Sequence, residues 1–141
     1  MFALAANGFN KPSETFIRAH AHGIAPGNTL LIAERRERKV PIRAPLILFS
    51  KRLPILIGPD AGMFGVLAGA LAPARLFASR SAYLARLLRR CRVDTMMVEY
   101  GSCAVHLTEA AQRAHCRFFV HFHGVDASKA LRDPEIVTRY K

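Results

Sequence analysis

The sequence predicts an α/β fold: a Rossmann-like, mostly parallel sheet with helices on both faces. Short apolar runs alternate with helical patterns along the chain, as they do in β-α-β units with right-handed crossovers. One run, Thr29–Ala33, is apolar throughout, which is typical of a strand covered on both faces. A chain of 141 residues is long enough for about one domain with a real hydrophobic core.

The first strand is expected at Phe2–Ala6, because this apolar run ends in the turn signal Asn7-Gly8. A helix should follow from Pro12 onward. Ser13 is a good N-cap, and Glu14 places negative charge on the first turn, where the helix dipole favours it. The apolar face of this helix is expected to consist of Phe16, Ile17, Ala21 and Ile24.

The middle of the chain is rich in proline, and one of its two apolar runs, Leu46–Phe49 or Ile55–Ile57, is expected to be the third strand. Beyond it, strand and helix patterns alternate regularly. They predict a helix over Arg75–Arg92, a strand at Thr95–Glu99, a helix at Cys103–Ala114, a strand at Arg117–His121, a loop at Gly124–Ser128 and a helix from Asp133. The chain stops inside that last helical pattern, which suggests a piece of something longer.

The charge balance is strongly basic, with 21 Lys and Arg residues against 10 acidic residues and a net charge of +11. Such a field attracts nucleic acid, anionic lipid or phosphorylated substrates. The sequence contains no helix-turn-helix, RNP-type aromatic pair or zinc-ligand set, so we expect no nucleic-acid partner. On the arginine-rich helix, Arg86 and Arg90 are candidates for contact with an anionic membrane surface; the alternative is a simple solvated face.

The sequence also indicates where the protein works. The three cysteines form no C-x-x-C pair, which favours reduced thiols. The N-terminus lacks the basic region of a signal peptide, and the longest apolar tract, Ala61–Phe77, is broken by glycines, a proline and an arginine. We therefore expect a cytoplasmic protein, with peripheral contact at the inner membrane as a further hypothesis.

The segment Val93–Ser128 carries the main candidate site, because its second strand delivers polar side chains to a carboxyl edge, where α/β sheets bind ligands. The imidazole of His123 can donate a hydrogen bond to a sugar hydroxyl or to developing charge. Gly124 would allow positive φ and close approach of a ligand. Asp126 would orient His123 or bind a hydroxyl; the alternative is a turn or N-cap carboxylate bonded to the N–H of Ser128.

A metal site is one alternative at the same edge, because His121 and His123 alternate along a strand, as in the H-x-H pairs of zinc hydrolases. The H-x-H-x-D-H arrangement would need an aspartate and a histidine where Val125 and Ala127 stand, so no metal is expected. We expect His121 to be a packed or hydrogen-bonded strand residue. Four more histidines fall on predicted helices and are expected to be surface or packing residues: His20, His22, His106 and His115.

Three segments resemble those of one family, the bacterial GT-B glycosyltransferases of family 4. Asn10-Lys-Pro-Ser-Glu-Thr-Phe-Ile-Arg18 resembles the family's F-P-x-x-S-E-T-F-I segment, and Val98-Glu-Tyr-Gly101 its H-x-x-[FY]-G segment. Phe119-Val-His-Phe-His-Gly-Val-Asp-Ala-Ser128 is similar to its V-x-F-H-G-Y-D-A-S loop. The segments occur in the family's order. Glu99 stands where histidine is common, and Val125 where an aromatic residue is frequent.

The resemblance implies an enzyme of two facing Rossmann-like halves, of which residues 1–141 would be a partial N-terminal, acceptor-side domain, unlikely to be active alone. The other half, with its E-x7-E motif, would bind the nucleotide sugar; no metal or other cofactor is needed. The whole enzyme would be a retaining transferase acting on a cell-surface glycan or glycolipid, with His123 beside the reacting sugar. The residues expected to bind the acceptor are Gly8, Ser13, Glu14, Glu99, Tyr100, Gly101, Gly124 and Asp126. The rival hypothesis is a non-catalytic, basic Rossmann-like module that binds anionic lipid or a partner.

Overall fold

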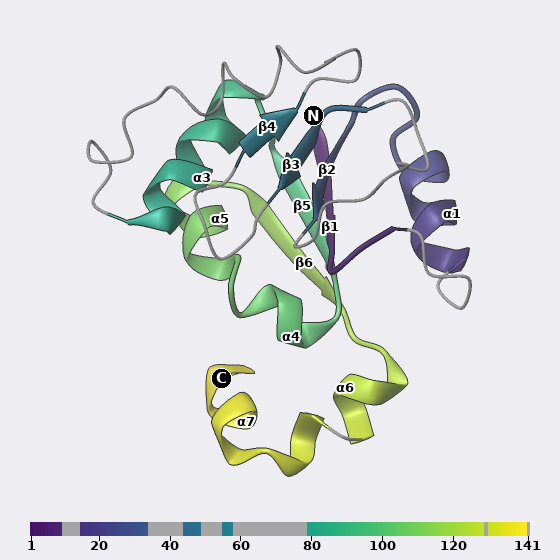
Figure 1. Cartoon of the computed structure of the whole chain (residues 1–141), viewed down its shortest axis with the longest axis vertical. Coiled ribbons are helices and arrows are strands. Elements are labelled where there is room, and N and C mark those ends of the chain that lie inside the picture. Colours follow the sequence, from purple (N-terminus) through teal and green to yellow (C-terminus); the bar gives the residue numbers. More distant parts are fainter. Residues whose placement is uncertain (10–14, 34–43, 49–54, 58–78, 129, 141) are drawn as a thin grey trace.

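A computed structural model describes residues 1–9, 15–33, 44–48, 55–57, 79–128 and 130–140. These residues contain one six-stranded sheet in the order β4-β3-β2-β1-β5-β6 (Figure 1). The strands are β1 Phe2–Ala6, β2 Thr29–Ala33, β3 Leu46–Leu48, β4 Ile55–Ile57, β5 Thr95–Glu99 and β6 Arg117–His121. All neighbours are parallel except β3 and β4, which pair antiparallel at one edge. The predicted fold class is therefore confirmed.

Helices cover both faces of this sheet. Helices α3 (Arg80–Arg90) and α5 (Thr108–Ala114) lie on one face, and α1 (Thr15–Gly23) lies on the other (Figure 1). The shorter elements gather beyond the carboxyl ends of β5 and β6 (Figure 1). They are α4 Gly101–Ala104, α6 Gly124–Ser128, the 3-10 helix η2 Ala130–Arg132 and α7 Pro134–Tyr140.

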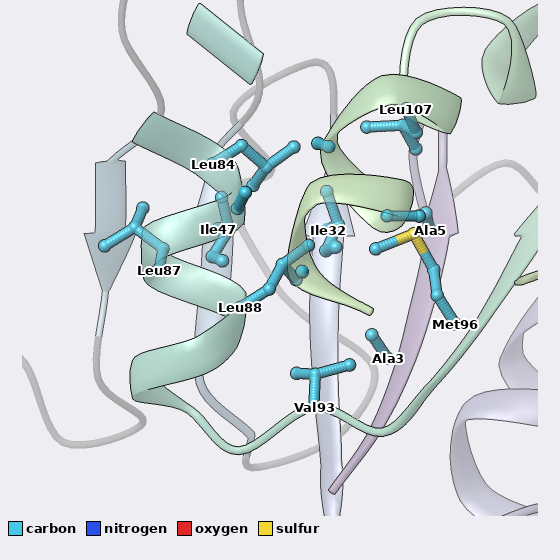
Figure 2. Packing of buried hydrophobic residues seen from close by; sticks show 14 of the residues in the cluster. Ala3, Ala5, Ile32, Ile47, Leu84, Leu87, Leu88, Val93, Met96 and Leu107 are labelled. Carbon is cyan, nitrogen blue, oxygen red and sulfur yellow. The ribbon is translucent and has the colours of Figure 1, made fainter. Parts of the chain in front are cut away.

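Alternation along the strands divides the core into two clusters. In β1, Ala3 and Ala5 face the larger cluster under α3 and α5, whereas Leu4 and Ala6 face the cluster under α1. Figure 2 shows the larger cluster, in which the leucines of α3 lie against the side chains of β2 and β3. The large buried side chains of α3 recur at the helical spacing that the sequence predicts, and Ala85 is buried beside them: Tyr83, Leu84, Leu87 and Leu88.

Four of the strands occupy the predicted residues, but three predictions about other segments were wrong. Both proline-flanked runs form strands, where only one was expected. The helix predicted over Cys103–Ala114 is two helices, because the chain tightens to i→i−3 hydrogen bonds at His106 and Leu107. The predicted loop at Gly124–Ser128 is helical. In addition, Ile24 follows the end of α1 and is 45% exposed rather than part of its apolar face.

The structure also bears on two further features, membrane-spanning helices and the state of the cysteines. Among the residues that the structure describes, no helix combines the length and the apolarity needed to cross a bilayer. None of the three cysteines, all of which the structure describes, forms a disulfide. Burial raises the pKa of the thiols of Cys91 and Cys116 above the usual value.

Candidate functional site

The site centres on Glu99, the last residue of β5. Its side chain is fully buried, at 0% exposure. Within β5, Met96 and Val98 belong to the cluster under α3 and α5, while Met97 packs against the cluster under α1. Glu99 continues this alternation and therefore points to the α1 side of the sheet. A carboxylate removed from water is costly unless other groups donate hydrogen bonds to it.

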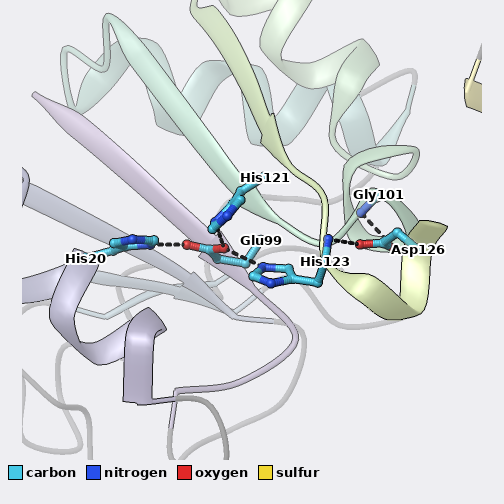
Figure 3. Close-up of polar contacts among 6 residues, drawn as sticks. All are labelled: His20, Glu99, Gly101, His121, His123 and Asp126. Carbon is cyan, nitrogen blue, oxygen red and sulfur yellow. Dashed lines mark hydrogen bonds and ion pairs between the residues drawn. The ribbon is translucent and has the colours of Figure 1, made fainter. Parts of the chain in front are cut away.

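Three imidazoles surround this carboxylate (Figure 3). Nδ1 of His20 lies 2.6 Å from Oε1, and Nδ1 of His121 lies 2.9 Å from Oε2. Nε2 of His123 lies 2.9 Å from Oε2 as well. An ionised carboxylate only accepts hydrogen bonds, so with Glu99 ionised each contacting ring nitrogen donates its proton. The cluster thus joins three separate segments of the chain around one buried charge.

The register of the sheet and the face of α1 explain why these histidines meet Glu99. In the β5–β6 ladder Glu99 is the direct partner of His121, and such cross-strand neighbours share a face. His20 lies four residues after Phe16 and three after the buried Ile17, on the inward side of α1. The prediction that His20 is a surface or packing residue was therefore incomplete, because its ring bonds the carboxylate at the centre of the site.

The ring of His123 is fixed on several sides. The rings of Phe16 and Tyr100 lie next to it, with centroid distances of 4.5 Å and 4.4 Å. Its Nε2 faces Glu99, and its backbone N–H donates to Oδ2 of Asp126 at 2.9 Å. Within the described part of the chain no hydrogen bond is found at its Nδ1, and the side chain is 17% exposed. The ring therefore offers one nitrogen to a ligand while the other is held.

Asp126 acts on His123 through the backbone. Its buried side chain accepts the N–H of Gly101 at 3.1 Å and that of His123 at 2.9 Å. The N–H groups of Asp126 and Ala127 donate in turn to the carbonyl of His123, which makes His123 the N-cap of α6; the bond from the His123 N–H to the Asp126 carboxylate is one half of a capping box. Asp126 is thus a carboxylate at a helix start, as in the alternative prediction, but its partners are the N–H groups of Gly101 and His123; the second of these bonds also holds the backbone of His123.

In the turn after β5 the residue with positive φ is Tyr100, at +78°, and not Gly101. Gly101 is required by close packing: a Cβ there would lie 2.6 Å from Cε1 of Phe122 and 2.6 Å from Oη of Tyr140. The predicted positive φ of Gly124 was wrong. Gly124 opens α6 with φ outside that region, and a Cβ there would have no atom within 4 Å.

The remaining predicted binding residues divide into two groups. Gly8 is buried just after β1, at the same carboxyl edge of the sheet. Ser13 and Glu14 lie outside the residues that the structure describes.

The other three histidines that were predicted on helices are exposed, as expected of surface residues: His22, His106 and His115.

The predicted membrane-contact residues lie elsewhere. Arg86 and Arg90 are exposed on α3. Helix α3 ends beside the amino ends of the strands, where the carbonyl of Arg92 accepts the N-terminal ammonium of Met1 at 2.9 Å. The basic end of α3 and the histidine cluster therefore lie at opposite edges of the sheet.

Part of the cluster also has the donor atoms of a metal site. The ligand atoms of His20, Glu99 and His121 all lie within 4.8 Å of one another. The H-x-H-x-D-H pattern involves only neighbouring positions from His121 onward, whereas His20 and Glu99 come earlier in the chain. Comparisons with protein-family models, curated proteins and solved structures found no match to this chain.

Proposed function

We propose that this chain is the acceptor-binding, N-terminal part of a retaining GT-B glycosyltransferase. The complete enzyme would transfer a sugar from a nucleotide-sugar donor to a cell-surface glycan or glycolipid. The proposal rests on the resemblance of three sequence segments and on the place where two of them meet. Glu99, Tyr100 and Gly101 from one segment contact His123 and Asp126 from another, at the sheet edge where α/β folds bind ligands.

The observation that carries the proposal is the fixed orientation of His123. Glu99 holds its Nε2, Asp126 holds its backbone N–H, and the neighbouring aromatic rings limit its rotation. With Nε2 donating to a carboxylate, a neutral imidazole presents Nδ1 as an acceptor. A sugar hydroxyl can donate to this nitrogen, so the geometry suits the positioning of an acceptor hydroxyl beside the reacting sugar.

The donor side of the reaction is assigned by the resemblance. A nucleotide sugar would be bound mainly by a second Rossmann-like domain, where helix N-termini and basic side chains stabilise the departing diphosphate. In this scheme the residues of the present chain bind and orient the acceptor, and transfer requires both domains.

Binding of glycans to the full 141-residue chain tests this proposal. We expect saturation-transfer NMR to detect binding of some members of a panel of bacterial surface oligosaccharides. His123→Ala should weaken that binding by about tenfold or more, because one oriented hydrogen bond to a hydroxyl is lost. His106→Ala, which changes an exposed histidine on the turn after α4, is the matched control and should bind like the wild type. Equal binding by His123→Ala, or no binding of any glycan, would contradict the proposal.

The second candidate function, a basic module that binds anionic lipid, is favoured by a different observation. The exposed Arg86 and Arg90 lie one helical turn apart on α3. In flotation assays, replacing both by Gln should weaken binding to phosphatidylglycerol vesicles by about tenfold or more, since each basic side chain near such a surface contributes about 1 kcal/mol. Replacing the exposed Arg18 and Arg132 instead is the charge-matched control. Unchanged binding after the α3 replacements would refute the module hypothesis.

A further inference from the structure

We propose that His20, Glu99 and His121 form a binding site for a divalent transition-metal ion of the zinc type. Their ligand atoms, two imidazole nitrogens and a carboxylate oxygen, lie within 4.8 Å of one another. They come from α1, β5 and β6, so the fold and not a local sequence motif assembles them. The inference goes beyond the proposed sugar transfer, in which no metal takes part.

The donor set matches the chemistry of zinc. Zn²⁺ binds imidazole nitrogen and carboxylate oxygen at about 2.0–2.2 Å, and two His with one carboxylate is a recurrent set of three protein ligands. Tetrahedral ligand atoms at that distance lie about 3.4 Å apart. The nitrogens of His20 and His121 now lie 2.6 Å and 2.9 Å from different oxygens of Glu99, and the three ligand atoms lie within 4.8 Å of one another. Binding an ion therefore requires these separations to change by up to about 1.4 Å.

The surroundings hold the ligands in place and leave a path for the ion. Glu99 is fully buried at the end of a central strand, so its carboxylate has little freedom to turn away. The side chains of His20 and His121 are 28% and 42% exposed, so the ion can enter from solvent between them. Three protein ligands with one position open to water is the arrangement of catalytic zinc sites.

His123 would support this site without being a ligand. Its Nε2 lies 2.9 Å from Oε2 of Glu99 and can keep that hydrogen bond while the carboxylate binds an ion. Such outer partners orient the ligating group, and their loss costs about 10–100-fold in metal affinity.

The test uses the untagged full chain, stripped of metal and titrated with Zn²⁺ by calorimetry and with Co²⁺ by absorption spectroscopy. We expect one ion per chain, with the visible bands of four-coordinate Co²⁺ and no binding of Mg²⁺ or Ca²⁺, which prefer sets of oxygen ligands. His20→Ala and His121→Ala should each weaken binding by about 100-fold or more, and His123→Ala by about tenfold. Circular dichroism confirms that each variant is folded.

Matched controls lie close to two of the ligands. His22→Ala, on the same helix as His20, and His115→Ala, just before β6, remove exposed imidazoles and should leave binding unchanged. The proposal is overturned by the absence of a one-to-one complex, or by wild-type affinity in folded His20→Ala and His121→Ala. An intense near-ultraviolet charge-transfer band with Co²⁺ would also overturn it, because it would show ligation by a cysteine. None of these outcomes depends on glycan binding.

Discussion

The two ends of β5 each carry a carboxylate with several partners, in opposite surroundings. Asp94, at the amino edge, lies 2.9 Å from the ammonium of Met1, 2.7 Å from the hydroxyl of Thr95 and 3.7 Å from Arg117. Its side chain is 63% exposed. Glu99, at the carboxyl edge, contacts three imidazoles at similar distances and is 0% exposed. The distances are alike, and the access of water differs.

This contrast indicates at which edge of the sheet the carboxylate contributes more to the stability of the fold. At Asp94, water competes for every hydrogen bond and salt screens the charges, so each exposed pair contributes little to stability. The side chain of Glu99 itself is out of contact with water, so the loss of a partner there leaves a desolvated group and costs more. The partners of Asp94 include two permanent cations, the ammonium of Met1 and Arg117. Even so, the cluster around Glu99 should contribute more to the stability of the fold.

The largest expected effect is that of Glu99→Ala. The substitution removes three hydrogen bonds to a charged group and leaves a cavity at the end of a central strand. Water can reach the three partly exposed rings and recover some of the loss. The free energy of unfolding, measured in urea, should fall by roughly 3 kcal/mol.

The matched control is Asp94→Ala, which removes the other carboxylate flanking the same strand. Because its side chain is 63% exposed, the urea midpoint at neutral pH should move far less than that of Glu99→Ala. Equal shifts in the two variants would contradict the conclusion that access of water, rather than the number of partners, determines how much each carboxylate contributes to stability.

The glycines of the carboxyl edge allow a second comparison. In Gly101→Ala the new methyl group must displace the rings of Phe122 and Tyr140, which lie 2.6 Å from the Cβ position. We expect a loss of about 1–3 kcal/mol in the free energy of unfolding, the usual cost of overpacking. Gly124→Ala is the control, because the space around its Cβ position is empty; it should be neutral or more stable by up to about 0.5 kcal/mol. If Gly124→Ala lowered the free energy of unfolding and Gly101→Ala did not, the conclusion that Gly101 and not Gly124 is tightly packed would be wrong.

The fold could be predicted from the sequence because its signals are local. Runs such as Thr29–Ala33 and Thr95–Glu99 are bounded by turn residues, and both form strands over the predicted residues. The break between α4 and α5 was missed, since its cause is a change of hydrogen-bond pattern at His106 and Leu107 that apolar spacing does not record. The strand β4 was uncertain because a three-residue run between prolines carries little periodicity.

The sequence could predict only those site residues that lie close to a strand end in the chain. Glu99, His123 and Asp126 could be predicted because they lie at or just after the ends of strands that meet at one edge. His20 was missed because its contact with Glu99 joins residues 79 positions apart. A signal was present, since His20 lies on the same helical face as Phe16 and Ile17. The strain at Tyr100 had no signal, because a tyrosine does not indicate a positive φ.

The smallest expected effect is that of Asp94→Asn, and it is the one that depends on pH. The hydroxyl of Thr95, followed by the ammonium of Met1, holds the pKa of Asp94 below its usual value. A lowered pKa in the folded state contributes stability that is fully present above the usual aspartate pKa of about 4 and is lost as the pH falls through the lowered value. The wild type should therefore exceed Asp94→Asn in urea midpoint at pH 7, and the difference should vanish in strong acid.

Salt separates this effect from that of Glu99. At about 0.5 M salt the exposed partners of Asp94 are screened, so the difference between wild type and Asp94→Asn should shrink at pH 7. The destabilisation in Glu99→Ala should persist, because buried groups are screened much less. A midpoint difference for Asp94→Asn that grows in acid would show that the carboxylate is not stabilised by its neighbours. Equal salt dependence of the two variants would show that water reaches both ends of β5 alike.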